Sequence, residues 1–193
     1  MIHFVSGDIL LSRAQVLAHG VAPNDPMTHG LALALRQKYP ALHKDFHHWC
    51  SQQHPKPGTA WMWGTAGGVR VVNLITQDGG YGTGAKPGRA SGHNVREAVR
   101  ELVKLAQSES FTSIAVPRLA TGVGALSWDE VRPVLEERLG ALKIPVYIYS
   151  EYHPGKVAHE PGLAAPQGRR PPDALTWLDT TAPAGDSARG RRV

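Results

Sequence analysis

The 193-residue chain is poor in cysteine and in long apolar runs. Its single cysteine, Cys50, excludes a disulfide within the chain and a cysteine-rich metal centre. No apolar run approaches the roughly 20 residues of a membrane-spanning helix, and the opening residues, MIHFVSGDIL, lack the basic and apolar regions of a signal peptide. We therefore expect a cytoplasmic protein that is neither exported nor embedded in a membrane.

Runs of adjacent basic residues are also scarce. The formal net charge is +5, yet the basic residues are spread along the chain, and adjacent pairs occur at Arg169–Arg170 and Arg191–Arg192. This distribution predicts an anion-friendly surface and no dedicated nucleic-acid groove. A nucleic-acid-associated role stays open as a weaker alternative, and a steep loss of DNA or RNA affinity with salt would support it.

The composition changes near residue 151. Residues 1–150 alternate short β-rich runs with amphipathic helical stretches, which predicts one α/β domain. Residues 151–193 are rich in Pro, Gly, Ala and Arg and have too little apolar periodicity for a core, so we expect a mostly disordered tail. Within it, the segment ALTWL at 174–178 has the apolar residues to dock on the domain or on a partner, although a stretch without a role is as good an interpretation.

The β-rich runs predict six strands, at 2–5, 15–20, 58–63, 69–76, 113–117 and 145–149. The helical stretches predict helices at 29–39, continued over 41–53, and at 93–109 and 127–139. Ser127 is expected to cap the last of these, since acidic residues follow it in the first turn.

Two segments join a strand to a helix through a glycine-containing loop, an arrangement that turns free backbone N–H groups toward an anion. In VPRLATGVGALSW, at 116–128, the glycines let the backbone approach a ligand closely. In GVAPNDPMTHG, at 20–30, Asn24 and Asp25 have side chains able to hydrogen-bond a ribose. Each pattern, taken alone, fits an ordinary tight or capped connection equally well.

Other segments have weaker signals. Asp8, directly after the first strand, is placed to accept a hydrogen bond from an exocyclic amine or to cap a turn. The glycine-rich segment 78–92 is long enough to be a lid, and Lys86 and Arg89 give it positive charge. His43 and His47 have the spacing of a zinc pair, but no third ligand is evident, so no metal site is predicted. Trp61 and Trp63 share one face of a strand, which indicates core packing.

Taken in order, these segments resemble the macrodomain family, and its terminal ADP-ribose glycohydrolase branch in particular. The matching pieces are GDIL at 7–10, LAHGVAPND and HGLALALRQKYP within 17–40, VVNLITQ at 71–77 and VPRLATGVGALSWDEVRPVLEE at 116–137. The resemblance implies a three-layer α/β/α fold with a central mixed sheet and ADP-ribose in a crevice at the strand ends. It implies adenine at Asp8 and Ile9, the diphosphate at the backbone of Thr121, Gly122, Val123, Gly124 and Ala125 together with His29 and Gly30, and the distal ribose near Asn24, Gln77 and Gly122.

Two departures from that branch bear on mechanism. Its glycohydrolases have a lysine where this chain has Gln77 and an acidic residue where it has Gly124. A glutamine forms no covalent lysyl adduct and a glycine is neither acid nor base, so that mechanism is not expected. Some bacterial relatives with glutamine at this strand end position a water instead, which makes Gln77 the predicted catalytic residue. Asp78 is adjacent, although neighbouring side chains on a strand point to opposite faces.

The resemblance therefore implies an ADP-ribose-binding domain that hydrolyses ADP-ribose from modified protein or nucleic acid, or from small ADP-ribose derivatives, without a cofactor. The alternative is a non-catalytic module that only binds ADP-ribose. A phosphatase acting on ADP-ribose 1″-phosphate in the same pocket is a third interpretation.

Overall fold

The structure, a computed structural model, describes residues 1–64, 68–81 and 84–164. Six strands form one sheet in the order β1-β6-β5-β2-β4-β3, and neighbours run parallel except β3, which is antiparallel to β4. The sheet is therefore mixed, as predicted. The strands are β1 (Ile2–Gly7), β2 (Val16–Val21), β3 (Ala60–Gly64), β4 (Arg70–Ile75), β5 (Ile114–Pro117) and β6 (Val146–Tyr152).

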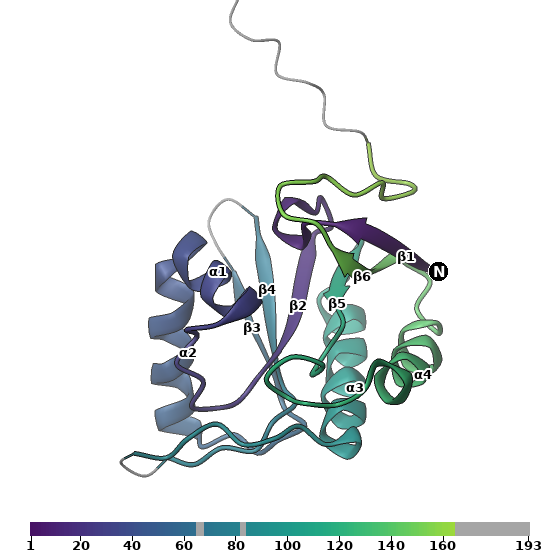
Figure 1. Cartoon of the computed structure of the whole chain (residues 1–193). Helices are drawn as coiled ribbons and strands as arrows, with labels where there is room; N and C mark the ends of the chain where they lie inside the picture. Colours follow the sequence, from purple (N-terminus) through teal and green to yellow (C-terminus); the bar gives the residue numbers. More distant parts are fainter. Residues whose placement is uncertain (65–67, 82–83, 165–193) are drawn as a thin grey trace, which may run out of the picture. The chain divides into compact units, whose positions relative to one another are not determined.

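Helices cover both faces of the sheet (Figure 1). Ile114 and Val116 of β5 pack in the core beneath α3 and α4, whereas Ala115 between them belongs to a cluster on the opposite face. This alternation follows from the two-residue period of a strand and confirms the predicted three-layer α/β/α arrangement. None of the described helices is long and apolar enough to cross a bilayer. The helices are α1 (Gly30–Lys38), α2 (Pro40–Gln53), α3 (Gly92–Ser108) and α4 (Trp128–Leu139), with a 3₁₀ turn, η1, at Ile9–Leu11.

The start of α4 is fixed by a reciprocal cap. The Ser127 hydroxyl accepts a hydrogen bond from the Glu130 backbone N–H, and the Glu130 carboxylate accepts one from the Ser127 N–H. These hydrogen bonds, first the backbone one and then that of the Ser127 hydroxyl, lower the pKa of Glu130. The cap holds the end of the glycine-containing loop that follows β5.

The folded unit continues past the boundary expected from the sequence. Residues Met1–Leu163 form one compact unit, so residues 151–163 belong to it and not to the tail that was placed from residue 151. β6 extends to Tyr152, and beyond it Ala158 and Glu160 are buried. The composition concealed this because long-range hydrogen bonds, among them those to the buried Glu160 carboxylate, anchor the segment in place of apolar periodicity. The ALTWL segment lies outside the described residues.

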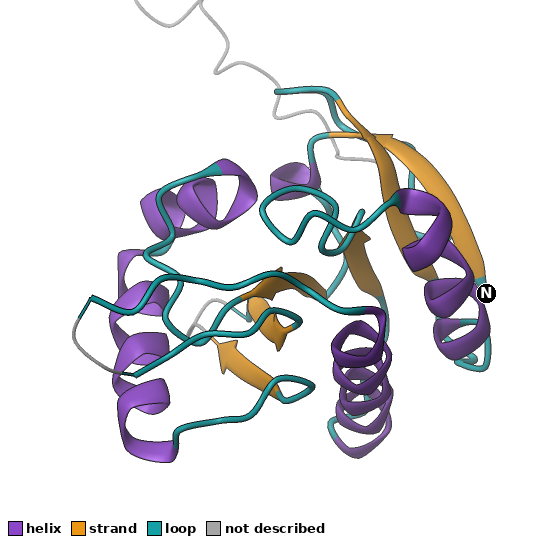
Figure 2. Ribbon diagram, turned by 60° about the horizontal axis from the view of Figure 1, so that its bottom comes forward, coloured by secondary structure: helices purple, strands orange, loops and turns teal. Residues whose placement is uncertain are grey.

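Because β1, β2, β4, β5 and β6 are parallel, the loops after their carboxyl ends come together at one edge of the sheet. Figure 2 shows loops gathered between the helices that lie on the two sides of the sheet. Two hydrogen bonds tie these loops to one another: Asn24 donates to the Ala85 carbonyl oxygen, and Ala90 N–H donates to the Gly124 carbonyl oxygen. Within the loop after β4, Asp78 N–H donates to the Arg89 carbonyl oxygen.

Candidate functional site

Two adjoining cavities lie at this edge of the sheet. The smaller, of about 470 Å³, is lined by residues from the loops after β2, β4 and β5. The larger, of about 620 Å³, lies toward β1 and the end of β6. Both are lined by the same five residues, which form a waist between them: Gly30, Leu31, Pro117, Arg118 and Gly122. The site is thus one cleft with two lobes, a shape that suits a ligand with two bulky ends and a narrow centre.

The waist is rich in backbone donors. The N-terminus of α1 faces it, and Gly30 begins that helix at a φ of +54°, a conformation that favours glycine. Its first N–H groups have no partner inside the helix, and they carry the positive end of the helix dipole. On the other side, the N–H groups of Gly122, Val123 and Gly124 have no acceptor among the described residues. The waist therefore offers backbone N–H groups of the kind that bind anions.

Ala125 does not have the role predicted for it in the diphosphate-binding loop. Its N–H donates to the Gly122 carbonyl oxygen over 3.0 Å, so it closes the loop internally, and Ala125 does not line either cavity. Ala125 has a φ of +60° and Ala120 one of +57°, which shows how tightly the loop turns. Thr121 lines the larger lobe, Gly122 lines both lobes, and Val123 and Gly124 line the smaller one.

Gly124 has no room for a side chain. A Cβ added there would lie 2.6 Å from the Ala120 carbonyl oxygen and 2.9 Å from the Ala90 Cβ. The acidic residue that the terminal glycohydrolase branch has at this position would therefore not fit the loop as it is folded here. Besides the sequence, the close packing around Gly124 therefore excludes an acidic side chain at this position.

The larger lobe contains the residues expected to hold adenine. Asp8 and Ile9 both line it, together with Tyr149 and Tyr152 from β6. Each Asp8 carboxylate oxygen already accepts one backbone hydrogen bond, from Leu10 N–H and from Gly155 N–H, both at 3.0 Å. These bonds fix the orientation of the carboxylate and leave lone pairs on it for a ligand. Glu151 and Tyr152, which also line this lobe, were not identified from the sequence because they follow a strand without any motif.

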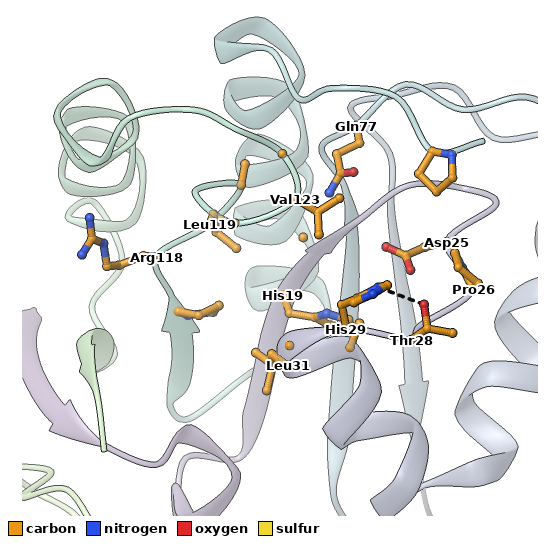
Figure 3. Close-up of a pocket in the computed structure, with 18 of the residues that line it drawn as sticks. His19, Asp25, Pro26, Thr28, His29, Leu31, Gln77, Arg118, Leu119 and Val123 are labelled. Atoms are coloured by element: carbon orange, nitrogen blue, oxygen red, sulfur yellow. Dashed lines mark hydrogen bonds between the residues drawn. The ribbon is translucent and has the colours of Figure 1, made fainter. Parts of the chain in front are cut away.

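The smaller lobe contains Gln77. Its side chain is 3% exposed, and its Oε1 atom has no hydrogen-bond partner among the described residues. A backbone bridge to Ala90 holds Gln77 in place at the end of β4. A buried amide oxygen without a partner is costly, which is a reason to expect a polar ligand or a water beside it. Figure 3 shows Gln77, Asp25, His29 and Val123 around this lobe.

Asn24 is not among the residues that line the cleft. Its amide nitrogen donates to the Ala85 carbonyl oxygen at 2.9 Å and so links the loop after β2 to the segment after β4. Its neighbour Asp25 lines the smaller lobe instead, as does His29, whose Nδ1 lies 3.0 Å from the Thr28 hydroxyl. Asp78 is also outside the cleft and accepts a hydrogen bond from the Asn94 side chain.

His19 forms the floor of the smaller lobe and has no motif in the sequence to mark it. It is 2% exposed, and its Nε2 lies 2.6 Å from Asn73 Oδ1 on the adjacent strand. Burial lowers the pKa of His19 from 6.5 to about 4, and the hydrogen bond to Asn73 only partly opposes this. The floor of the lobe is therefore an uncharged imidazole near neutral pH.

This burial predicts a pH-dependent stability. Between pH 6.5 and pH 4 the unfolded chain binds a proton at His19 and the folded chain does not, so stability rises with pH in this window and falls as the pH is lowered. We expect a loss of about 2 kcal/mol between pH 7 and pH 5 from this residue. Urea unfolding at the two pH values measures it. His19→Gln should remove the loss, whereas the exposed His93→Gln should keep it; an equal pH dependence in all three proteins would contradict the assignment.

Two histidines of α2, His43 and His47, lie next to the loop after β2. Within the described part of the chain there is no group of three or more residues able to hold a metal ion. His47 instead donates from Nε2 to the Asp25 carbonyl oxygen at 2.7 Å, and the rings of His43 and His47 lie 4.3 Å apart. The pair therefore supports the loop after β2. Trp61 stacks on Trp49, and Trp63 donates to Asp45, so these tryptophans pack between β3 and α2.

The sequence profile of the macro domain family matches residues 22–135, which include the loops after β2, β4 and β5. The chain belongs to the macro domain family. This macrodomain is 26% identical over 159 residues to a DNA ADP-ribosyl transferase-DNA ADP-ribosyl glycohydrolase fusion protein of Thermosipho africanus, a match that covers 75% of this chain and 40% of the relative. It is 28% identical over 153 residues to a DNA ADP-ribosyl glycohydrolase of Thermus aquaticus, covering 77% of this chain and 41% of the relative.

Among solved structures, the macrodomain is similar to Thermosipho africanus DarTG in complex with ADP-ribose, with a TM-score of 0.68 and 23% identity. That likeness covers 81% of this chain and 42% of the solved one. The chain spans about 40% of the length of the curated relatives that it matches. The matches confirm the predicted family and fold, and they relate this macrodomain to domains of proteins named for ADP-ribosyl glycohydrolysis.

Proposed function

We propose that this macrodomain binds ADP-ribose in the two-lobed cleft and hydrolyses ADP-ribosyl groups from modified macromolecules or small ADP-ribose derivatives. The observation that carries the proposal is the set of backbone N–H groups without an acceptor among the described residues at the waist and beside it, from the α1 N-terminus and Gly122 at the waist and from Val123 and Gly124 in the adjoining smaller lobe. A diphosphate there would have a nucleoside at one end and a ribose at the other, one for each lobe.

The lobes differ in chemistry, and this sets the direction in which ADP-ribose would bind. The larger lobe offers the Asp8 carboxylate and apolar and aromatic side chains, which suit adenine. The smaller lobe offers the amide of Gln77 and the carboxylate of Asp25, which suit a hydroxyl-rich ribose and a water. The scissile bond at the anomeric carbon C1″ of the distal ribose would thus lie in the smaller lobe, near Gln77.

In this proposal Gln77 positions the attacking water. An amide is both a hydrogen-bond donor and an acceptor but neither loses nor takes up a proton at neutral pH, so Gln77 would act by orientation. The unpartnered Oε1 supports this role because it leaves an acceptor for a water proton. Since the relatives are named for DNA ADP-ribosyl groups, ADP-ribosylated DNA is the first substrate to examine, followed by ADP-ribosylated protein.

A reader module that binds ADP-ribose without turnover is the second candidate. Gln77 in place of a lysine, and the packing that leaves no space for an acid at Gly124, favour it. The two candidates share the binding step and differ in release of ADP-ribose.

We expect calorimetry to detect ADP-ribose binding that depends on the waist. A Cβ added at Gly122 meets no protein atom within 4 Å, so Gly122→Leu should fold normally and obstruct the waist. We expect it to weaken ADP-ribose binding at least tenfold, about 1.4 kcal/mol. Gly92→Leu is the matched control, because Gly92 has the same free space outside the cleft. No heat with wild-type protein, or equal affinity in both variants, would contradict the proposed site.

A further inference from the structure

Asp25 and Gln77 both line the smaller lobe, and among the residues that line this lobe Asp25 has the sole carboxylate. Figure 3 shows the Asp25 carboxylate and the Gln77 amide directed into the same space. Sequence reasoning considered Asp25 as a ribose contact and considered Asp78 as a base, but Asp78 lies outside the cleft. The structure therefore brings a carboxylate to the amide from a different strand end.

Asp25 is held rigidly although it lies in a loop. Its Oδ1 accepts a hydrogen bond of 2.7 Å from the N–H of Met27, a fully buried residue. Its backbone is fixed at both ends, since its N–H donates to the Ala22 carbonyl oxygen and its carbonyl oxygen accepts from His47. No donor among the described residues forms a hydrogen bond to the Asp25 Oδ2 atom. One oxygen thus anchors the carboxylate, and the other stays available to a ligand or a water.

The other ionisable groups of the lobe are less suited to take a proton from a water there. His19 has its Nε2 engaged with Asn73, and burial lowers its pKa to about 4, so it is a poor proton acceptor at neutral pH. His29 is exposed, and its Nδ1 is engaged with the Thr28 hydroxyl. Lys86 is also exposed. Geometry therefore favours Asp25.

We propose that Asp25 is the general base of the hydrolysis, removing a proton from the water that Gln77 orients. This inference rests on the proposed function. As the water oxygen forms its bond to C1″, the bond from C1″ to the modified atom breaks, and its electron pair leaves with that atom. Asp25 takes one proton of the water and passes it through solvent, and the leaving group takes up a proton, so that the products are ADP-ribose and the unmodified acceptor.

The assignment is tested by Asp25→Asn in the full chain, because asparagine keeps an oxygen for Met27 N–H but cannot act as a base. We expect kcat for ADP-ribose release to fall about 10²–10⁴-fold, with the affinity for ADP-ribose within about threefold of wild type. The acidic limb of the wild-type pH–rate profile should disappear from the residual activity. Formate should restore part of the activity to Asp25→Ala, which a purely structural role would not permit.

Asp78→Asn is the matched control, since it makes the same chemical change next to Gln77 but outside the cleft. It should keep wild-type release, and thermal unfolding should show that all variants fold. If Asp25→Asn releases ADP-ribose within threefold of wild type, Asp25 is not the base and the hydrolase proposal still stands. If wild-type protein releases none from any substrate while it binds ADP-ribose, the hydrolase proposal and this role for Asp25 both fail.

Discussion

Replacement of Gln77 by alanine should lower the rate of ADP-ribose release about 10²–10³-fold while ADP-ribose still binds. The amide is almost completely buried at the end of β4, and its Oε1 has no partner among the described residues, so the water beside it would lose its orientation. The backbone bridge between Gln77 and Ala90 does not involve the side chain and should survive the change. Single-turnover release and calorimetry on the same preparation measure the two effects separately.

The matched control is Gln107→Ala, which removes an exposed glutamine amide from α3. It should leave release and binding at wild-type values. If Gln77→Ala keeps the wild-type rate, the water is held by other groups and the assignment of Gln77 fails. If it loses binding as well as release, Gln77 contributes to binding of the distal ribose and its effect is not confined to catalysis.

Replacement of Glu160 by alanine should cost about 3–5 kcal/mol of folding stability. Glu160 is 2% exposed, and its carboxylate accepts hydrogen bonds from the Ser12 hydroxyl, the Arg13 N–H and the Tyr149 hydroxyl. The Arg13 Nε also lies 3.7 Å from it. Removal of the carboxylate leaves these buried donors without an acceptor. Their desolvation then lowers the free energy of unfolding in addition to the loss of the contacts themselves. Urea or thermal unfolding measures the effect.

Glu137→Ala is the control for Glu160, because Glu137 forms ion pairs with Arg96 and Arg138 at an exposed position. We expect a change of less than about 1 kcal/mol there. The Glu160 variant should also weaken ligand binding in the larger lobe, since the segment that Glu160 anchors carries Gly155, whose N–H fixes the Asp8 carboxylate. Equal stability of the two variants would contradict the proposed role of the buried carboxylate.

The elements of this fold were predictable from local patterns. All six predicted strands and the main helices form near the expected residues, because alternating apolar residues and the Ser127 cap each act over a few positions. The mixed sheet was expected only from the resemblance to a family, and neither the order of the strands nor the antiparallel β3 was predicted. The end of the domain was misplaced because Glu160 is buried by long-range hydrogen bonds to Ser12, Arg13 and Tyr149, which leave no periodic signal in a Pro- and Gly-rich segment.

The cleft was predicted less completely than the fold, for a physical reason. Asn24 and Asp25 are neighbours in one loop, and only the three-dimensional path of that loop decides that Asp25 enters the smaller lobe while Asn24 binds Ala85. Ala125 was expected to offer its N–H to a ligand, but the loop uses that group to close on Gly122. A sequence shows which groups a loop contains, whereas their use depends on the hydrogen bonds of the folded loop.

Removal of ADP-ribose from a modified target is the activity proposed for the cleft. It is measured as release of free ADP-ribose by the full chain from a panel of base-linked, ester-linked and glutamate-linked substrates, ADP-ribosylated DNA among them. We expect release above a buffer blank for at least one linkage, and the loss of that release in Gln77→Ala. If release equals the blank for every linkage while the protein binds ADP-ribose in calorimetry, the hydrolase proposal is wrong and the macrodomain is a module that only binds ADP-ribose.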